Sequence, residues 1–325
     1  MTITMAHGSG GRETSALIRE VFETSYGNPV LARMEDAAVL PAGERIALTT
    51  DSFVVQPLFF PGGDIGRLAV CGTVNDLLTS GAEPRYLTAG FILEEGLPVE
   101  TLRTVARSMA ETAAEAGVSI VAGDTKVVEG RGGMYINTAG VGILRGDAFT
   151  ARAIRPGDAL LLSGTLGEHH ACILSQRMEI NNDIRSDAAP LTGMVRSLLE
   201  ERIGVRAIRD ITRGGLATVL NELCEAAGCA LELMEESLPV LPSVAGFCGV
   251  LGLDPLYMGN EGKMAFAVPW EEREAALSVL RLAPYGDQAT IVGRFAEGKG
   301  VTLRTRIGGL RRIPPLSGEG LPRIC

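Results

Sequence analysis

Three features are missing from the sequence, and each absence excludes a class of protein. No uncharged apolar run reaches the roughly 18 residues of a membrane span, and the opening segment MTITMAHGSGGRE has no apolar core of a secretory signal. Basic residues are in the minority, since 30 Lys and Arg stand against 39 Asp and Glu, for a net charge of −9. Because phosphate backbones are bound by clustered Lys and Arg, nucleic acid is not an expected partner. We expect a cytoplasmic protein that binds neither membranes nor nucleic acid.

The six cysteines form no metal-binding or disulfide pattern. None is part of a C-x-x-C pair, which argues against a structural zinc site, and cytosolic thiols stay reduced. Five of them lie in apolar stretches such as LAVCGTV and are expected to be small core residues. These are Cys71, Cys172, Cys224, Cys229 and Cys248. Cys325 differs, because it follows the Gly- and Pro-containing run GEGLPRI, where there is no core to fill.

What the sequence does contain is an α/β pattern that occurs twice. A hydrophobic content of 46% and a charged content of 21% are those of a globular protein, and 325 residues suffice for two domains. Apolar and β-branched runs predict strands at 45–55, 85–93, 118–128 and 134–144, and helical spacing predicts helices at 64–82 and 98–117. A turn at Pro156-Gly157 precedes a second α/β set. This set begins with a strand at 158–164, a helix from about Glu168 and a helix at 191–201, and it continues through the segments 205–228, 263–269, 271–282 and 289–295.

The two sets predict an α/β (α+β) protein of two domains that divide near residue 150. The N-terminal domain is expected over 1–150 and the C-terminal domain over 151–310. A tail over 311–325 completes the chain. The stretch GGLRRIPPLSGEGLPRIC has no periodicity and much Pro and Gly, so we expect an irregular, mobile segment there.

A glycine cluster is the first candidate ligand site. HGSGG brings Gly8, Gly10 and Gly11 together, and consecutive backbone N–H groups of this kind can bind an anion. Neither a Walker A motif nor a full G-x-G-x-x-G is present, so a floppy N-terminus is the alternative. The paired glycines of DITRGGL, with Gly214 at a predicted helix start, offer a second place where phosphate can approach backbone.

The aspartates are more informative as a group than singly. They are Asp36, Asp51, Asp76, Asp124 and Asp210, and most of them lie at ends or turns of apolar elements. Each alone is explained as a strand end or a helix cap. If they converge, cations are required, because two carboxylates about 4 Å apart repel by roughly 4 kcal/mol at an effective dielectric near 20. Hard oxygen ligands suit Mg²⁺, which usually bridges to nucleotide phosphates.

The sequence resembles the HypE family of hydrogenase maturation factors, in the superfamily of aminoimidazole ribonucleotide synthetase and selenophosphate synthetase. The resemblance covers essentially the whole length. It is carried by HGSGG, EDAAVL, LTTDSFVVQPLFFPGGDIGRLAVCGTVNDL, GAEPRYLTAGFILEEGLP, AGDTKVVE, DITRGGL, GNEGK and the final PRIC. One departure is Glu35, which precedes Asp36 where the family often has a second Asp.

The resemblance implies a PurM-like fold whose N-terminal domain forms a homodimer and holds ATP and Mg²⁺ near the interface. It implies a carbamoyltransferase partner, HypF, and a HypC–HypD scaffold complex. It also implies site residues of three kinds. The catalytic residues are Cys325, Lys126 and Glu261; the nucleotide-binding residues are Gly8, Gly10, Gly11, Asp51, Asn75, Gly123, Asp124, Thr125 and Gly214; the metal ligands are Asp36, Asp51, Asp76 and Asp210.

The implied reaction is the ATP-dependent dehydration of a carbamoyl group on Cys325 to a thiocyanate, the source of cyanide for [NiFe] hydrogenase. Phosphorylation would convert the amide oxygen into a leaving group, with Glu261 as base and Lys126 at the phosphorylated oxygen, or the reverse. Two alternatives stay open. One is selenophosphate synthetase or thiamine-phosphate kinase activity, although HGSGG lacks the Cys and Lys of the former and neither family needs a terminal Cys. The other is a non-enzymatic nucleotide-binding scaffold.

Overall fold

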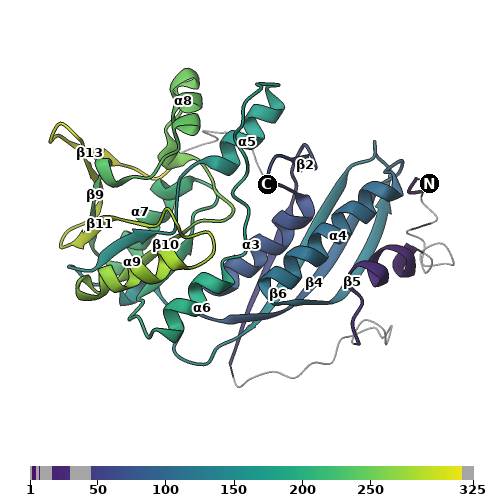
Figure 1. Ribbon diagram of the computed structural model, residues 1–325, viewed down its shortest axis with the longest axis horizontal. Coiled ribbons are helices and arrows are strands. Elements are labelled where there is room, and N and C mark those ends of the chain that lie inside the picture. The colour runs from purple at the N-terminus through teal and green to yellow at the C-terminus, as the bar shows by residue number, and fades with distance from the viewer. Residues whose placement is uncertain (1, 5–6, 8–16, 30–44, 317–325) are drawn as a thin grey trace.

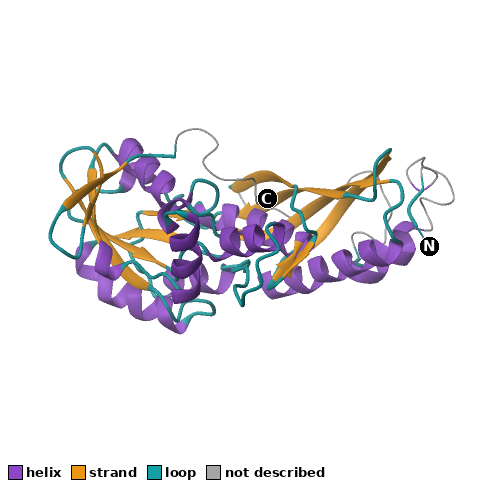
Figure 2. Ribbon diagram, turned by 90° about the horizontal axis from the view of Figure 1, so that it is seen from above, coloured by secondary structure: helices purple, strands orange, loops and turns teal. Residues whose placement is uncertain are grey.

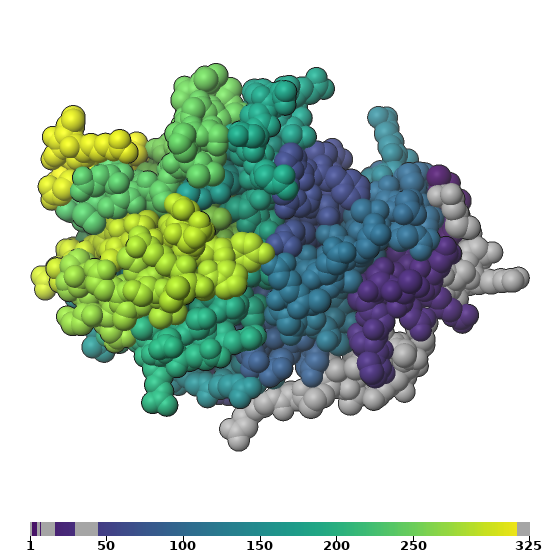
Figure 3. All heavy atoms as spheres, in the orientation of Figure 1, coloured from purple at the N-terminus to yellow at the C-terminus, as the bar shows by residue number. Residues whose placement is uncertain are grey.

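The chain folds into two α/β parts that lie side by side (Figure 1). The computed structural model describes residues 2–4, 7, 17–29 and 45–316. Within these residues, a four-stranded sheet is built from the first part and a seven-stranded sheet from the second. Figure 3 shows the side chains of the two parts in contact along their boundary. The predicted division near residue 150 falls between β6, which ends at Ile143, and β7, which begins at Ala159.

The first sheet has the strand order β1-β6-β4-β5. Its strands are β1 (Ile46–Phe53), β4 (Glu83–Glu94), β5 (Ser119–Val128) and β6 (Met134–Ile143). Helices α3 (Ile65–Thr79) and α4 (Val99–Ala116) cover one face of it (Figure 2). Helix α4 ends, as predicted, at Gly117, whose φ of +74° is the left-handed conformation that glycine supplies at helix C-termini. A short helical stretch (η2, Ile18–Glu23; α2, Thr24–Tyr26) and the ribbon of β2 (Phe59–Phe60) and β3 (Gly63–Asp64) flank this part.

The other face of the first sheet exposes large apolar side chains. Strand β1 alternates along its length, so that Ile46 and Leu48 point away from the helices and Leu48 is 71% exposed. Ile92 on β4 and Val128 on β5 are exposed as well. Exposed apolar side chains on one face of a sheet are common at protein interfaces.

The second sheet has the order β13-β12-β9-β11-β7-β10-β8. Its strands are β7 (Ala159–Leu162), β8 (Ala207–Asp210), β9 (Ala230–Met234), β10 (Met264–Val268), β11 (Thr290–Ala296), β12 (Gly300–Arg304) and β13 (Leu310–Ile313). The helices are α5 (Glu168–Arg177), α6 (Thr192–Glu200), α7 (Gly215–Ala227), α8 (Pro242–Leu251) and α9 (Arg273–Leu282). Single 3₁₀ turns occur at Ala151–Ala153, Glu235–Ser237, Pro255–Tyr257 and Trp270–Glu272. Strands β7 and β10 are buried throughout, which explains their unbroken apolar runs.

The prediction of an irregular segment from residue 308 onward is wrong for Leu310–Ile313. These residues form β13, which pairs antiparallel with β12, and Ile313 is buried in the second core. Gly308, with φ of +85°, turns the chain between the two strands. The prediction for the cysteines is confirmed for Cys71, Cys172, Cys224, Cys229 and Cys248, which are free and buried. None of the helices in the described part of the chain is long and apolar enough to span a membrane.

Candidate active site

Helix α3 lies at the centre of the candidate site. It begins behind Asp64, whose Oδ1 accepts hydrogen bonds from the backbone N–H groups of Gly66 and Arg67 at 2.7 and 3.1 Å. The helix is buried almost all round, because it packs on β1 and β6 of the first sheet and also on β8 of the second. Its last turns therefore place Asn75 and Asp76 at the boundary between the two parts.

Three of the four predicted metal ligands lie on or beside this helix: Asp76 belongs to it, and Asp51 and Asp210 are its neighbours. Thr49 on β1 donates a 2.9 Å hydrogen bond to Oδ2 of Asp76. Asp51 also lies against α3, since a Cβ atom at Gly72 would be only 3.5 Å from its Oδ2. Burial, and then the negative charges of Asp210 and Asp51, raise the pKa of Asp76 to about 6. Burial likewise raises the pKa of Asp51 and of Asp210 above the ordinary aspartate value.

The arrangement of these carboxylates limits how they can hold a metal ion. In the described residues, no three His, Cys, Asp or Glu side chains come close enough to hold one ion together. Asp36, the fourth predicted ligand, lies outside the described residues. Carboxylates that repel one another are nevertheless stabilised by a cation, and Mg²⁺ usually binds one or two carboxylates while it keeps several waters. Separate aspartates of this kind offer oxygen donors of the type that hydrated Mg²⁺ accepts.

Asn75 and Glu261 meet where α3 touches the second part of the chain. Oδ1 of Asn75 accepts a 2.9 Å hydrogen bond from the backbone of Leu191, and its Nδ2 donates to the carbonyl oxygens of Ala189 and Glu261 at 3.0 and 3.4 Å. The side chains of Asn75 and Glu261 are both buried. Asn75, a predicted nucleotide-binding residue, thus joins the two parts of the chain and brings Glu261 next to the aspartate-bearing helix.

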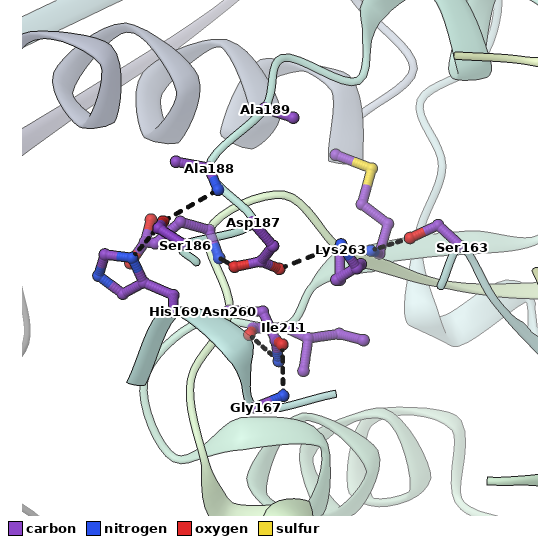
Figure 4. A network of polar contacts seen from close by, with 12 residues as sticks. Ser163, Gly167, His169, Ser186, Asp187, Ala188, Ala189, Ile211, Asn260 and Lys263 are labelled. Atoms are coloured by element: carbon purple, nitrogen blue, oxygen red, sulfur yellow. Dashed lines mark hydrogen bonds and ion pairs between the residues drawn. The ribbon is translucent and has the colours of Figure 1, made fainter. Parts of the chain in front are cut away.

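The neighbours of Glu261 in GNEGK fix the loop on both sides (Figure 4). Asn260 accepts a 2.7 Å hydrogen bond from the backbone N–H of Gly167 and donates one of 3.2 Å to the carbonyl of Ile211, the residue after Asp210. A Cβ at Gly262 would lie 1.9 Å from the carbonyl oxygen of Asp187, so only glycine fits there. The loop is therefore tied to the segment that carries Asp210.

Lys126 and Asp124 lie far from this cluster within one chain. Nζ of Lys126 is 2.8 Å from Oδ2 of Asp124, and both side chains are about two-thirds exposed on β5. The strand register aligns Asp124 with Gly90, Asn137 and Ser52 on successive strands. Three strand spacings, or about 14 Å, thus separate β5 from β1. Asp51 moreover faces α3, whereas Lys126 lies on the opposite face of the sheet.

The other predicted nucleotide-binding residues have local structural reasons for their identity. Gly123 has no room for a side chain, because a Cβ would lie 2.6 Å from the carbonyl oxygen of Ala89. Thr125 is buried, and its backbone N–H donates to Oδ1 of Asp124 at 2.9 Å. Gly214 precedes α7 with φ of +80°. Gly8, Gly10 and Gly11 lie outside the described residues.

The last described residues run along α7 toward the aspartates. Nδ2 of Asn221 donates to the carbonyl of Ile313 at 3.0 Å, and the backbone N–H of Leu316 donates to Oγ1 of Thr218 at 3.2 Å. Because Asn221 and Thr218 follow each other toward the start of α7, the chain is directed at the loop between Asp210 and Gly214. Cys325 lies outside the described residues, nine positions beyond Leu316.

Comparison with known proteins identifies the family of the chain. Residues 34–144 match the family model described as AIR synthase related protein, N-terminal domain, and residues 155–306 match its C-terminal counterpart. The curated carbamoyl dehydratase HypE of Rhodobacter capsulatus is 49% identical over 334 residues, which cover 99% of this chain and 98% of that protein. The chain belongs to the HypE family of carbamoyl dehydratases.

Solved HypE structures share the whole architecture. A crystal structure of HypE in complex with ATP matches with a TM-score of 0.96 and 46% identity and covers 100% of both chains. HypE in a HypE–HypF complex matches with a TM-score of 0.82 and 47% identity and covers 93% of this chain and 100% of that one. The predicted two-domain α/β fold and the HypE resemblance are confirmed. The site residues of this HypE-family chain remain predictions.

Proposed function

We propose that the chain dehydrates a carbamoyl group carried on Cys325, at the expense of ATP, and so supplies the cyanide ligand of [NiFe] hydrogenase. Curated carbamoyl dehydratases that match nearly the full length support the activity, and the ATP complex of a HypE protein supports the nucleotide. The observation that carries the proposal is the grouping of the half-buried Asp51, Asp76 and Asp210 carboxylates at α3, the helix whose Asn75 contacts Glu261 at the domain boundary. The described end of the chain is directed at that boundary.

The reaction balances without any further reagent. The amide oxygen of the S-carbamoyl group attacks the γ-phosphorus, and the bond from that phosphorus to ADP breaks. Loss of one N–H proton gives a phosphorylated imidate; its C–O bond then breaks, phosphate leaves, and loss of the second N–H proton gives S–C≡N. The amide thus contributes the elements of water, and the products are thiocyanate, ADP, phosphate and a proton.

Each charged side chain has a separate proposed role in this reaction. Glu261, buried beside α3, receives the amide proton, and Lys126 contacts the phosphorylated oxygen. Asp51, Asp76 and Asp210, with Asp36, would hold Mg²⁺, which offsets the charge of the transferring phosphoryl group. Gly214 at the start of α7, together with Gly8, Gly10, Gly11, Gly123, Asp124 and Thr125, provides the proposed nucleotide contacts.

A homodimer with a shared site accounts for the position of Lys126. The open face of the first sheet, which exposes Leu48 on the edge strand β1, is the proposed dimer surface. Because Lys126 lies on that face at the edge strand, it would reach the site of the partner rather than its own. HypF is the proposed carbamoyl donor, supported by the HypE–HypF complex of a relative, and a HypC–HypD complex is the proposed cyanide acceptor.

Mass spectrometry of the C-terminal peptide tests the proposal. With HypF, a carbamoyl donor and ATP, the peptide that contains Cys325 is expected to gain a carbamoyl group and then to lose one water. Lys126→Ala and Glu261→Ala should accept the carbamoyl group but form no thiocyanate, whereas Cys325→Ala should accept nothing. Carbamoylation that never leads to dehydration in the native protein would instead support a scaffold.

A further inference from the structure

A buried ion pair between Asp187 and Lys263 lies next to the backbone of Glu261. Oδ2 of Asp187, in the segment between α5 and α6, is 3.4 Å from Nζ of Lys263, which directly precedes β10. Their side chains are only 1% and 10% exposed. Because burying two charges costs free energy that their attraction often fails to recover, such a pair is weak evidence for stability and calls for another explanation.

The Asp187 carboxylate connects this pair to Glu261. Its Oδ1 accepts a 3.1 Å hydrogen bond from the backbone N–H of Glu261, while its Oδ2 faces the Lys263 ammonium (Figure 4). Gly262 lies between Glu261 and Lys263 and packs against the backbone of Asp187. One carboxylate therefore holds both the peptide group of Glu261 and the cation two residues further on.

Other charged groups face the same cluster from each neighbouring element. Glu168 on α5 and Asp287 lie near Lys263, and the burial of its ammonium is outweighed by Asp187 and Glu168, so that the pKa of Lys263 is raised. On the side of the first sheet, Cys71 of α3 lies within electrostatic range of Glu261 and Asp187. Arg67 of the same helix donates a 2.7 Å hydrogen bond to the carbonyl of Ala188, next to Asp187, and forms an ion pair with Glu115. Of these charged groups, Asp187 is hydrogen-bonded to the backbone of Glu261 and Lys263 follows Glu261 by two residues.

We propose that Asp187 and Lys263 are positioning residues that hold Glu261 in place and set the charge around its carboxylate for the dehydration step. The inference rests on the proposed function, in which Glu261 handles the amide proton. The pair acts through Glu261, so it is needed for loss of water and not for acceptance of the carbamoyl group.

Two single substitutions separate the electrostatic role from a merely structural one. Asp187→Asn keeps an oxygen that can accept the Glu261 N–H but removes a negative charge, which favours ionised Glu261. Lys263→Met keeps an aliphatic stem under Gly164, where Cε of Lys263 lies, but removes the positive charge and disfavours ionised Glu261. The acid limb of the pH–rate profile is expected to move by about one pH unit, downward for Asp187→Asn and upward for Lys263→Met.

The experiment measures single-turnover water loss from the Cys325 peptide as a function of pH, with full-length protein, HypF, a carbamoyl donor and ATP. The double variant Asp187→Asn/Lys263→Met restores the net charge, so its acid limb should return toward that of the native protein. Glu232→Gln is the matched control, because it breaks an exposed ion pair with Arg304 in the same sheet. It should leave the profile unchanged, and carbamoylation should be normal in every variant.

Shifts in the same direction for both single variants, or no shift in either, would overturn the inference. If Lys263→Met does not fold, Asp187→Asn and Lys263→Gln decide by the same opposite signs. Glu261→Gln distinguishes a failure of the proposed role of Glu261 from a failure of the role of the Asp187–Lys263 pair. Normal dehydration by Glu261→Gln would exclude the proposed role of Glu261 and, with it, the role of the Asp187–Lys263 pair. If Glu261→Gln fails to dehydrate but Asp187→Asn and Lys263→Met keep the native pH–rate profile, only the role of the pair is excluded.

Discussion

Thr49 on β1 and Asp76 on α3 are joined by a 2.9 Å hydrogen bond from the threonine hydroxyl to the aspartate Oδ2. This bond favours the ionised carboxylate, yet burial and the neighbouring Asp210 have the larger effect and raise the pKa of Asp76 to about 6. The folded protein therefore binds the Asp76 proton more tightly than the unfolded chain does. Part of the stability at acid pH is lost as the pH rises through 6.

Asp76→Asn is expected to stabilise the protein in the absence of metal above pH 6, by up to about 3 kcal/mol in the free energy of unfolding. The gain should disappear near pH 4, where Asp76 is protonated in the folded state, and dehydration activity should be lost at every pH. Urea unfolding with a chelator present measures the effect. Asp124→Asn is the control, since Lys126 holds the pKa of that exposed carboxyl low and no gain is expected.

Mixed dimers test whether two chains share a site. Lys126→Ala and Asp76→Asn should each be inactive alone, because every site of either homodimer lacks one group. Unfolded together and refolded, they should recover roughly a quarter of the native rate, since half of the dimers are mixed and each has one complete site. A mixture that stays inactive although mixed dimers form would place both residues in a site within one chain.

Gly262→Ala should strongly destabilise the protein, because the new Cβ would lie 1.9 Å from the carbonyl oxygen of Asp187 and the two loops cannot both keep their positions. We expect a loss of at least about 2 kcal/mol in the free energy of unfolding. Gly249→Ala in α8 is the matched comparison, since a Cβ there meets nothing within 4 Å and should be neutral or stabilising. Equal effects on the midpoint of thermal unfolding would contradict the tight packing at Gly262.

The elements of the first part were predictable because their signals are local. The helix over Val99–Ala116 shows its amphipathic spacing and its terminal glycine in sequence. Strand β13 was not predictable, because the four residues LRRI do not alternate and become a strand only through their pairing with β12.

The candidate site was predictable only in part. The positions of Asp51, Asp76 and Asp210 near ends of apolar elements indicate convergence, and in the structure Asp51 and Asp210 lie near Asp76 of α3. The order β1-β6-β4-β5 does not follow the sequence, so the separation of Lys126 from Asp51 could not be foreseen. Asp187 belongs to no motif, and only the fold reveals its burial next to Lys263.

The hydrogen bond that ties Leu316 to α7 also limits how far the end of the chain can reach. The nine residues beyond Leu316 can span at most about 30 Å, so Cys325 stays within that distance of α7 whatever path they take. A thiol on so short a tether has an effective concentration on the order of millimolar. A free cysteine peptide would need a comparable concentration to compete. In the proposed function, the reactive one-carbon group would then pass from donor to acceptor without ever becoming a diffusing molecule.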